Sequence, residues 1–157
     1  MTSNFQLLSI DPAGFTPLFL LTDQELDNRQ MKRVRADKDR GFPCRISLED
    51  ARKGEELILF SFHHHAVSSP YNTSGPIYIR KNAVQAYPGI NEIPSMFLSR
   101  IISVRPYDAQ GMMRAPEVCE GTALKETLGR ILDNNLIQYI HLHFANAGCY
   151  ACKVVRR

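Results

Sequence analysis

The chain has 157 residues, of which 44% are hydrophobic and 22% charged, and its net charge at pH 7 is +3. This composition is typical of one folded domain and excludes a disordered or fibrous chain. No apolar run approaches the ~20 residues that span a bilayer, and Asp11, Pro12 and Gly14 interrupt any secretory signal pattern. We therefore expect a single domain over residues 1–157, in the cytoplasm, with no membrane segment and with its four cysteines reduced.

The first half of the chain predicts strands separated by short helices. Residues 5–10 favour a first strand that ends at turn residues. Thr22 and Glu25 have the spacing of a capping box, which predicts a short helix over residues 23–28. A serine cap followed by acidic residues and a glycine stop predicts a second brief helix over residues 47–54.

A basic segment lies between these two predicted helices. Residues 29–40 contain six basic and two acidic residues, a net charge of +4. We interpret this segment as an exposed connection. Two acids dilute its charge and no aromatic residue is interleaved, so we do not expect nucleic-acid binding.

The second half predicts a strand-rich core with one longer helix. Residues 57–62 form a strongly apolar, central strand. Residues 122–132 place their apolar side chains on one helical stripe, which predicts the longest helix near the C-terminal end. Further strands are expected over residues 77–80, 97–104, 136–144 and 149–155, the last two forming a hairpin.

Few helices, separated by strands, indicate an α+β fold. We expect one compact domain with a mixed or antiparallel sheet, short helices, one longer C-terminal helix and a final β-hairpin. If the last strand is an open edge of the sheet, it would allow a homodimer.

The final hairpin carries a pair of histidines. His141 and His143 lie two residues apart in one strand, so both project from one face. A four-residue loop over 145–148 would pair His143 with Tyr150 and His141 with Cys152 on that face. Two imidazoles so placed could hold a metal or move protons, although the local sequence offers no third ligand. The alternative is a polar strand face without a ligand.

Other candidate site residues lie in the middle of the chain. In the run His63–His65, alternation places His64 on the opposite side from its two neighbours, so all three cannot serve one site while the strand is extended. One of them could face a cleft, with His64 as the candidate, or the three could form a loose surface cluster. The loop that follows is rich in hydroxyls and free amides, and could cradle an anion or simply satisfy its own backbone. Its candidate residues are Ser69, Tyr71, Ser74 and Gly75, with Arg80 beyond them.

Two cysteine motifs require weighing. Cys44 stands beside Arg45 just before a predicted helix, and a cation near a thiol favours a nucleophile, whereas a buried structural cysteine is the alternative. Arg45 or Arg80 could then hold an anionic group. Cys149 and Cys152 form a CxxC motif in a predicted strand, where residues three apart point to opposite faces, which argues against a disulfide or zinc site.

Three functional hypotheses follow. The first is a module that binds a small molecule or a protein through a polar pocket of histidine, tyrosine and arginine. The second is an enzyme that acts on an anionic substrate, with candidates Cys44, His64, Tyr71, His141 and His143 as nucleophile or base. The third is a metal protein built on His141 and His143. The sequence has no phosphate loop, nucleophile elbow or zinc helix, and it specifies no cofactor.

Several motifs together resemble the bacterial family catalogued as domain of unknown function 1203. The resemblance runs over nearly the whole chain and implies no activity, substrate or cofactor. It implies a pattern that does not require Cys152, His63 or His65. The motifs that carry it are Gly41–Arg45, Ser69–Tyr71, Ser74–Ile77 and Arg80, Tyr107–Ala109, Gly111–Met113, His141-x-His143 and Gly148–Tyr150. The positions that the family pattern includes are Cys44, Arg45, His64, Tyr71, His141, His143 and Cys149.

Overall fold

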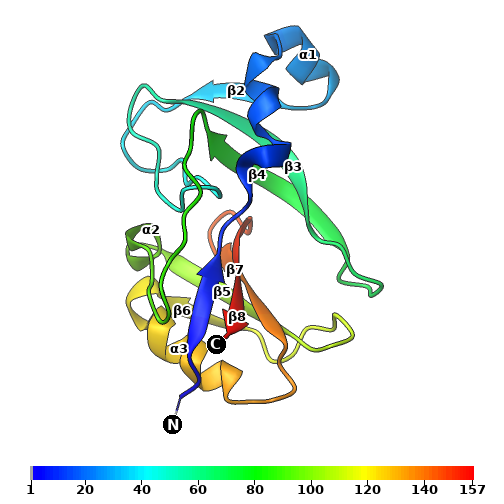
Figure 1. The fold of residues 1–157 in the computed structure, drawn as a ribbon, viewed down its shortest axis with the longest axis vertical. Helices are drawn as coiled ribbons and strands as arrows, with labels where there is room; N and C mark the ends of the chain where they lie inside the picture. The colour runs from blue at the N-terminus through cyan, green and yellow to red at the C-terminus, as the bar shows by residue number, and fades with distance from the viewer. Residues whose placement is uncertain (1) are drawn as a thin grey trace.

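Two antiparallel sheets form the frame of the molecule (Figure 1). A computed structural model describes residues 2–157, and it confirms the α+β fold class and the terminal hairpin. Within these residues no helix is long and apolar enough to cross a membrane. The larger sheet has the strand order β1 (Phe5–Leu8), β8 (Tyr150–Arg156), β7 (Tyr139–Phe144), β5 (Ile101–Tyr107) and β6 (Glu117–Glu120). The smaller sheet has the order β2 (Lys32–Arg35), β3 (Glu56–His65) and β4 (Thr73–Arg80).

The helices form where the sequence provides caps or an apolar stripe. Helix α1 (Asp23–Asn28) has the predicted capping box, in which Thr22 and Glu25 each bond the other's backbone N–H. Helix α3 (Leu124–Leu132) continues from the 3₁₀ turn η3 (Gly121–Ala123). The remaining helical segments are η1 (Pro12–Gly14), η2 (Thr16–Leu20) and α2 (Ser95–Leu98).

Each sheet packs on its own apolar cluster. The larger cluster joins α3 to one face of the five-stranded sheet, with Leu128, Ile140 and Leu142 fully buried. The smaller cluster lies against the three-stranded sheet and contains Ile58 and Ile77. In Figure 1, helices α2 and α3 lie to the left of the larger sheet, and β3 and β4 lie above it. The opposite face of β7 is therefore directed toward the three-stranded sheet.

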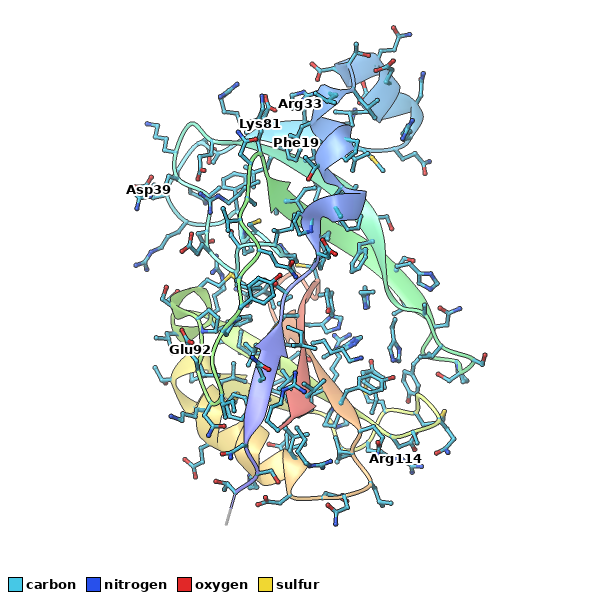
Figure 2. All side chains as sticks on the ribbon, in the orientation of Figure 1. Phe19, Arg33, Asp39, Lys81, Glu92 and Arg114 are labelled. Atoms are coloured by element: carbon cyan, nitrogen blue, oxygen red, sulfur yellow. The ribbon has the colours of Figure 1, made fainter. Side chains whose placement is uncertain are left out.

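Side chains occupy the region between the two sheets (Figure 2). In that view Phe19, Arg33 and Lys81 lie close together near β2 in the upper part of the molecule, while Arg114 lies in the lower part. The aromatic ring of Tyr150, which begins β8, belongs to the apolar cluster of the smaller sheet and so links the two sheets.

The prediction of a helix over residues 47–54 is wrong. The backbone of Leu48 has a φ of 52°, which stops a right-handed helix at that residue. The segment closes on itself instead: the Cys44 N–H donates to the Glu49 carbonyl, and the Ala51 N–H to the Phe42 carbonyl. Burial of Leu48 and Ala51 stabilises this turn.

The prediction that residues 29–40 are an exposed connection is wrong in part, because residues 32–35 form β2. Its basic side chains meet acids: Arg33 pairs with Asp23 and Glu56, and Lys32 with Asp27. Those ion pairs neutralise part of the local charge and allow the strand to lie beside β3.

Other strand boundaries differ from the predictions. The predicted strand over 97–104 begins as helix α2, and β5 runs from 101 to 107. Strand β4 begins at Thr73, so Ser74 and Gly75 belong to a strand instead of a loop. Strand β6 lies in a segment for which we predicted no element.

The hairpin register also needs correction. His143 pairs with Tyr150 as predicted, but an irregularity between Leu142 and His143 shifts the next pairs. His141 therefore lies opposite Lys153, and Cys152 pairs with Leu142 in the apolar core. The expectation that Cys152 shares the histidine face is wrong.

The prediction that the last strand is an open edge is wrong as well. Strand β8 lies between β1 and β7, and the edges of that sheet are β1 and β6. The argument for a homodimer through the final strand therefore fails.

Candidate functional site

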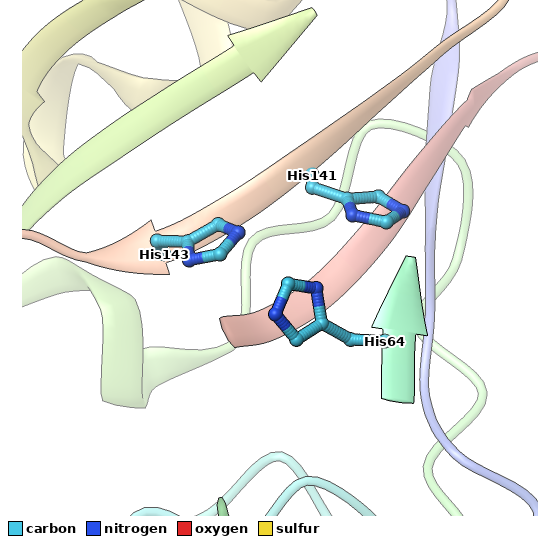
Figure 3. A group of neighbouring side chains, drawn as sticks. All are labelled: His64, His141 and His143. Carbon is cyan, nitrogen blue, oxygen red and sulfur yellow. The ribbon is translucent and has the colours of Figure 1, made fainter. Parts of the chain in front are cut away.

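Three histidines from two different sheets meet between those sheets (Figure 3). His141 and His143 come from β7, and His64 comes from β3. Each offers one ring nitrogen, and these three nitrogens lie within 4.8 Å of one another. The rings point into a shared space from opposite sides.

The local sequence accounts for this placement. Strand alternation directs His141 and His143 to the same face, while Ile140 and Leu142 enter the core behind them. On β3 the pairing with β4 becomes irregular between Phe62 and His65, close to the end of the strand. Gly75 lies opposite Phe62, and a Cβ on it would approach the His64 Nε2 to 3.7 Å, so the glycine leaves this side of the ring uncrowded.

Each histidine has a buried ring nitrogen with no hydrogen-bond partner within residues 2–157. These atoms are Nδ1 of His64, Nδ1 of His141 and Nε2 of His143. A buried polar atom without a partner costs about 1–3 kcal/mol, so three beside one another are unusual in a folded protein.

A backbone contact fixes the ring of His143. Its Nδ1 lies 2.9 Å from the carbonyl oxygen of Gly148 and donates to it, which leaves a lone pair on Nε2. Gly148 has a φ of 79°, a conformation that favours glycine and shapes the turn between β7 and β8. The turn thus selects the nitrogen that His143 presents to the other two rings.

Burial keeps the three imidazoles neutral. Burial, together with the neighbouring His65 and Arg105, lowers the pKa of His64 to about 4. Burial likewise lowers the pKa of His141 to about 2 and that of His143 to about 4. All three rings are therefore neutral at pH 7, the form that ligates metals.

Aromatic side chains surround the three histidines. Tyr150 stacks on His64 with ring centroids 4.9 Å apart, and lies edge-on to His141 at 5.0 Å. His65 lies 4.9 Å from His141 and also contacts Tyr107, at 4.1 Å. Alternation predicted that the three histidines of the run could not all serve one site; the strand is irregular between Phe62 and His65, and both His64 and His65 lie beside His141.

His65 is held by two hydrogen bonds. Its Nε2 lies 2.7 Å from the hydroxyl of Tyr139, and its Nδ1 lies 2.8 Å from the carbonyl of Tyr71. Both nitrogens of His65 are thus engaged, whereas each of the three clustered histidines has one buried nitrogen without a partner. Tyr71, a predicted site residue, reaches the cluster only indirectly, through this carbonyl and through ring contact with Tyr107.

Two cations flank His141. Arg105 lies opposite it on β5 and Lys153 opposite it on β8. Arg105 bonds only the hydroxyl of Ser103, and Lys153 lies 4.7 Å above the ring of Tyr139. Neither forms an ion pair with a carboxylate in the described part of the chain. The sequence alone did not identify them, because only the strand register shows that they are neighbours of His141.

The remaining predicted residues lie elsewhere. Cys44 is fully buried in the smaller apolar cluster, and its Sγ accepts a hydrogen bond from the Arg80 N–H. Arg80 itself pairs with Glu49 and Glu55, so carboxylates of the chain already occupy its guanidinium. Ser69 accepts from the Tyr71 N–H and donates to the Gly111 carbonyl. Ser74 is exposed on β4.

Arg45 contacts a different thiol from the one that the sequence suggests. It is 1% exposed, and its Nη2 lies 3.1 Å from the Sγ of Cys149. Its Nε donates to the Tyr150 carbonyl at 2.7 Å. All four cysteines are free, and Cys152 is buried in the core, so the CxxC motif forms neither a disulfide nor a shared site.

Comparisons with known proteins identify a family but no characterised relative. Neither the curated proteins nor the solved structures give a match to this chain. A family model described as "Protein of unknown function (DUF1203)" matches residues 41–156, which include all three clustered histidines and both Arg45 and Cys149. The match covers most of the chain, and the protein therefore belongs to the DUF1203 family.

Proposed function

We propose that the protein binds one transition-metal ion through His64, His141 and His143. The observation that carries this proposal is the convergence of three buried, unpartnered ring nitrogens from β3 and β7. A bound cation would give each nitrogen the partner that it lacks. It would also link the two sheets, since β3 and β7 belong to different ones.

The donor set indicates the class of metal. Three neutral imidazoles suit zinc, copper, iron or nickel, whereas calcium and magnesium require oxygen ligands. The ligand nitrogens of a tetrahedral zinc ion lie about 3.3 Å apart. Small rotations of the three rings would bring their nitrogens, now within 4.8 Å of one another, to that spacing. The hydrogen bond from His143 to Gly148 is the kind of outer contact that orients a metal-ligating histidine.

The number of ligands points to a reactive centre. Structural zinc sites use four protein ligands, whereas catalytic sites use three and leave a position for water or substrate. A metal in such a site supplies Lewis-acid activation of bound water at neutral pH. We therefore favour an enzyme of the hydrolase or hydratase type over a structural metal site.

The flanking charges suggest the substrate class. Arg105 and Lys153 stand on either side of His141, and neither is paired with a carboxylate of residues 2–157. Together with a metal cation they would attract a carboxylate or phosphate group. The enzyme hypothesis from the sequence also has an anionic substrate, with Cys44 or a histidine as the nucleophile or base.

Four free cysteines suit a reducing compartment, and this supports the cytoplasmic location that we propose. A small molecule is the partner that the site favours, while nucleic acid is not expected.

Zinc titration by isothermal calorimetry tests the proposal. Chelator-treated wild-type protein should bind one zinc ion per chain, and His143→Ala should weaken binding by more than about 100-fold. His63→Ala is the matched control, because His63 adjoins His64 but is exposed and contacts Asn72. Absence of binding in the same titration with zinc, copper, iron and nickel in turn, or an equal loss in His63→Ala, would overturn the proposal.

A further inference from the structure

A cavity lies beside the turn between β7 and β8. It has a volume of about 580 Å³ and is lined by both charged and aromatic residues. Its lining residues include Arg45, Arg100, Cys149, Phe144, Tyr78 and Asn146. No part of the proposed metal centre lines it.

Arg45 is a buried cation without a counter-charge. It is 1% exposed, and no carboxylate within residues 2–157 forms an ion pair with it. Its partners are two backbone carbonyls and the Sγ of Cys149. A guanidinium has five N–H donors, so these three bonds leave two donors free. A buried charge is costly unless an opposite charge accompanies it.

Arg100, the other arginine that lines the cavity, has a counter-charge, unlike Arg45. Arg100 forms a two-pronged ion pair with Asp50, with contacts of 2.6 and 2.9 Å, and so is neutralised within the chain. Both guanidinium groups lie 5.1 Å from the centre of the Phe144 ring. The cavity therefore has a net positive charge, which comes from Arg45, and an aromatic wall between its two arginines.

We propose that this cavity binds a small oxyanion, a carboxylate or a phosphate, which supplies the missing counter-charge of Arg45. Planar, two-pronged contacts suit a guanidinium to either group. Cys149, half-buried and in contact with Arg45, would lie directly beside the bound anion. This site does not depend on the proposed metal and can be tested without it.

Protection of Cys149 from alkylation is the direct test. Iodoacetamide converts the thiolate to a thioether and releases iodide, and peptide mass spectrometry reports each cysteine separately. Inorganic phosphate, sulfate and benzoate, added in turn to the wild-type protein, should slow alkylation of Cys149 in a saturable manner. Cys119 is half-buried and does not line the cavity, so its rate should not change.

A charge variant localises the effect without disturbing the core. Asn146 is exposed at the rim of the cavity, and the negative charge of Asn146→Asp should weaken binding of the protecting anion about tenfold by repulsion. Asn135→Asp adds the same charge at an exposed position away from the cavity, and should leave protection unchanged. If none of the three anions protects Cys149, or if both variants weaken protection equally, no anion site exists in this cavity.

Discussion

The neutral histidine cluster predicts a specific dependence of stability on pH. An unfolded histidine has a pKa near 6.5, whereas burial lowers the pKa of His141 to about 2 and of His143 to about 4. Below pH 6.5 the unfolded chain therefore binds protons that the folded chain excludes. By linkage, the free energy of unfolding falls as the pH drops through 6.5, and it continues to fall toward the folded pKa values.

The size of this stability loss follows from the difference between the unfolded pKa and the solution pH. At pH 5, the unfolded pKa lies about 1.5 units above the solution pH, so each of these two histidines costs about 2 kcal/mol. Together they should remove about 4 kcal/mol between pH 7.5 and pH 5, a large part of the 5–15 kcal/mol typical of a domain. His64 is more exposed, and we assign it a smaller share.

Urea unfolding of chelator-treated protein at pH 7.5 and pH 5 measures this loss. Most carboxylates remain ionised in both states over that range, so histidines dominate the difference. A double variant, His141→Leu with His143→Leu, should lose far less stability over the same interval than the wild type does. A wild-type stability that is flat between the two pH values, or an equal loss in the double variant, would refute the reasoning.

Four further substitutions test the packing and the charges. Gly121→Ala should destabilise the fold by about 3 kcal/mol or more in urea unfolding, because its Cβ would lie 1.8 Å from the Phe97 carbonyl oxygen. Gly14→Ala, which has open space around it, should change stability by less than about 1 kcal/mol. Leu128→Ala should cost about 2–5 kcal/mol by the same assay, since Leu128 is fully buried between α3 and the larger sheet. Arg105→Gln should raise the pKa of His143 in an NMR titration of the metal-free protein, because the charge of Arg105 is among those that lower it; an unchanged or lower pKa would show that Arg105 does not act on this ring.

Local patterns in the sequence predicted local structure well. The capping box at Thr22 and Glu25, the apolar stripe of α3 and the final hairpin are each set by residues close together in the chain. Alternation also predicted that His141 and His143 share a face, and both do point toward the three-stranded sheet.

The complete site depended on contacts between distant segments. His64 lies on a strand of the other sheet, and no local pattern indicates which histidine of the run meets β7. The thiol that contacts Arg45 also comes from a distant segment of the chain, so the local sequence did not identify it. Cys44, the sequence neighbour of Arg45, enters the apolar core, and the turn between β7 and β8 supplies Cys149 instead.

The metal content of the protein, purified without a tag from cells and analysed by mass spectrometry of the elements, tests the central claim most directly. We expect close to one equivalent of zinc, iron, copper or nickel per chain in the wild type and in His63→Ala. The content should fall to background in His64→Ala, His141→Ala and His143→Ala. Two results would contradict the assignment of His64, His141 and His143 as a metal centre. One is a background metal content in the wild type that does not rise when zinc, iron, copper or nickel is added to the purified chain. The other is a metal content in the three variants that is as high as in the wild type.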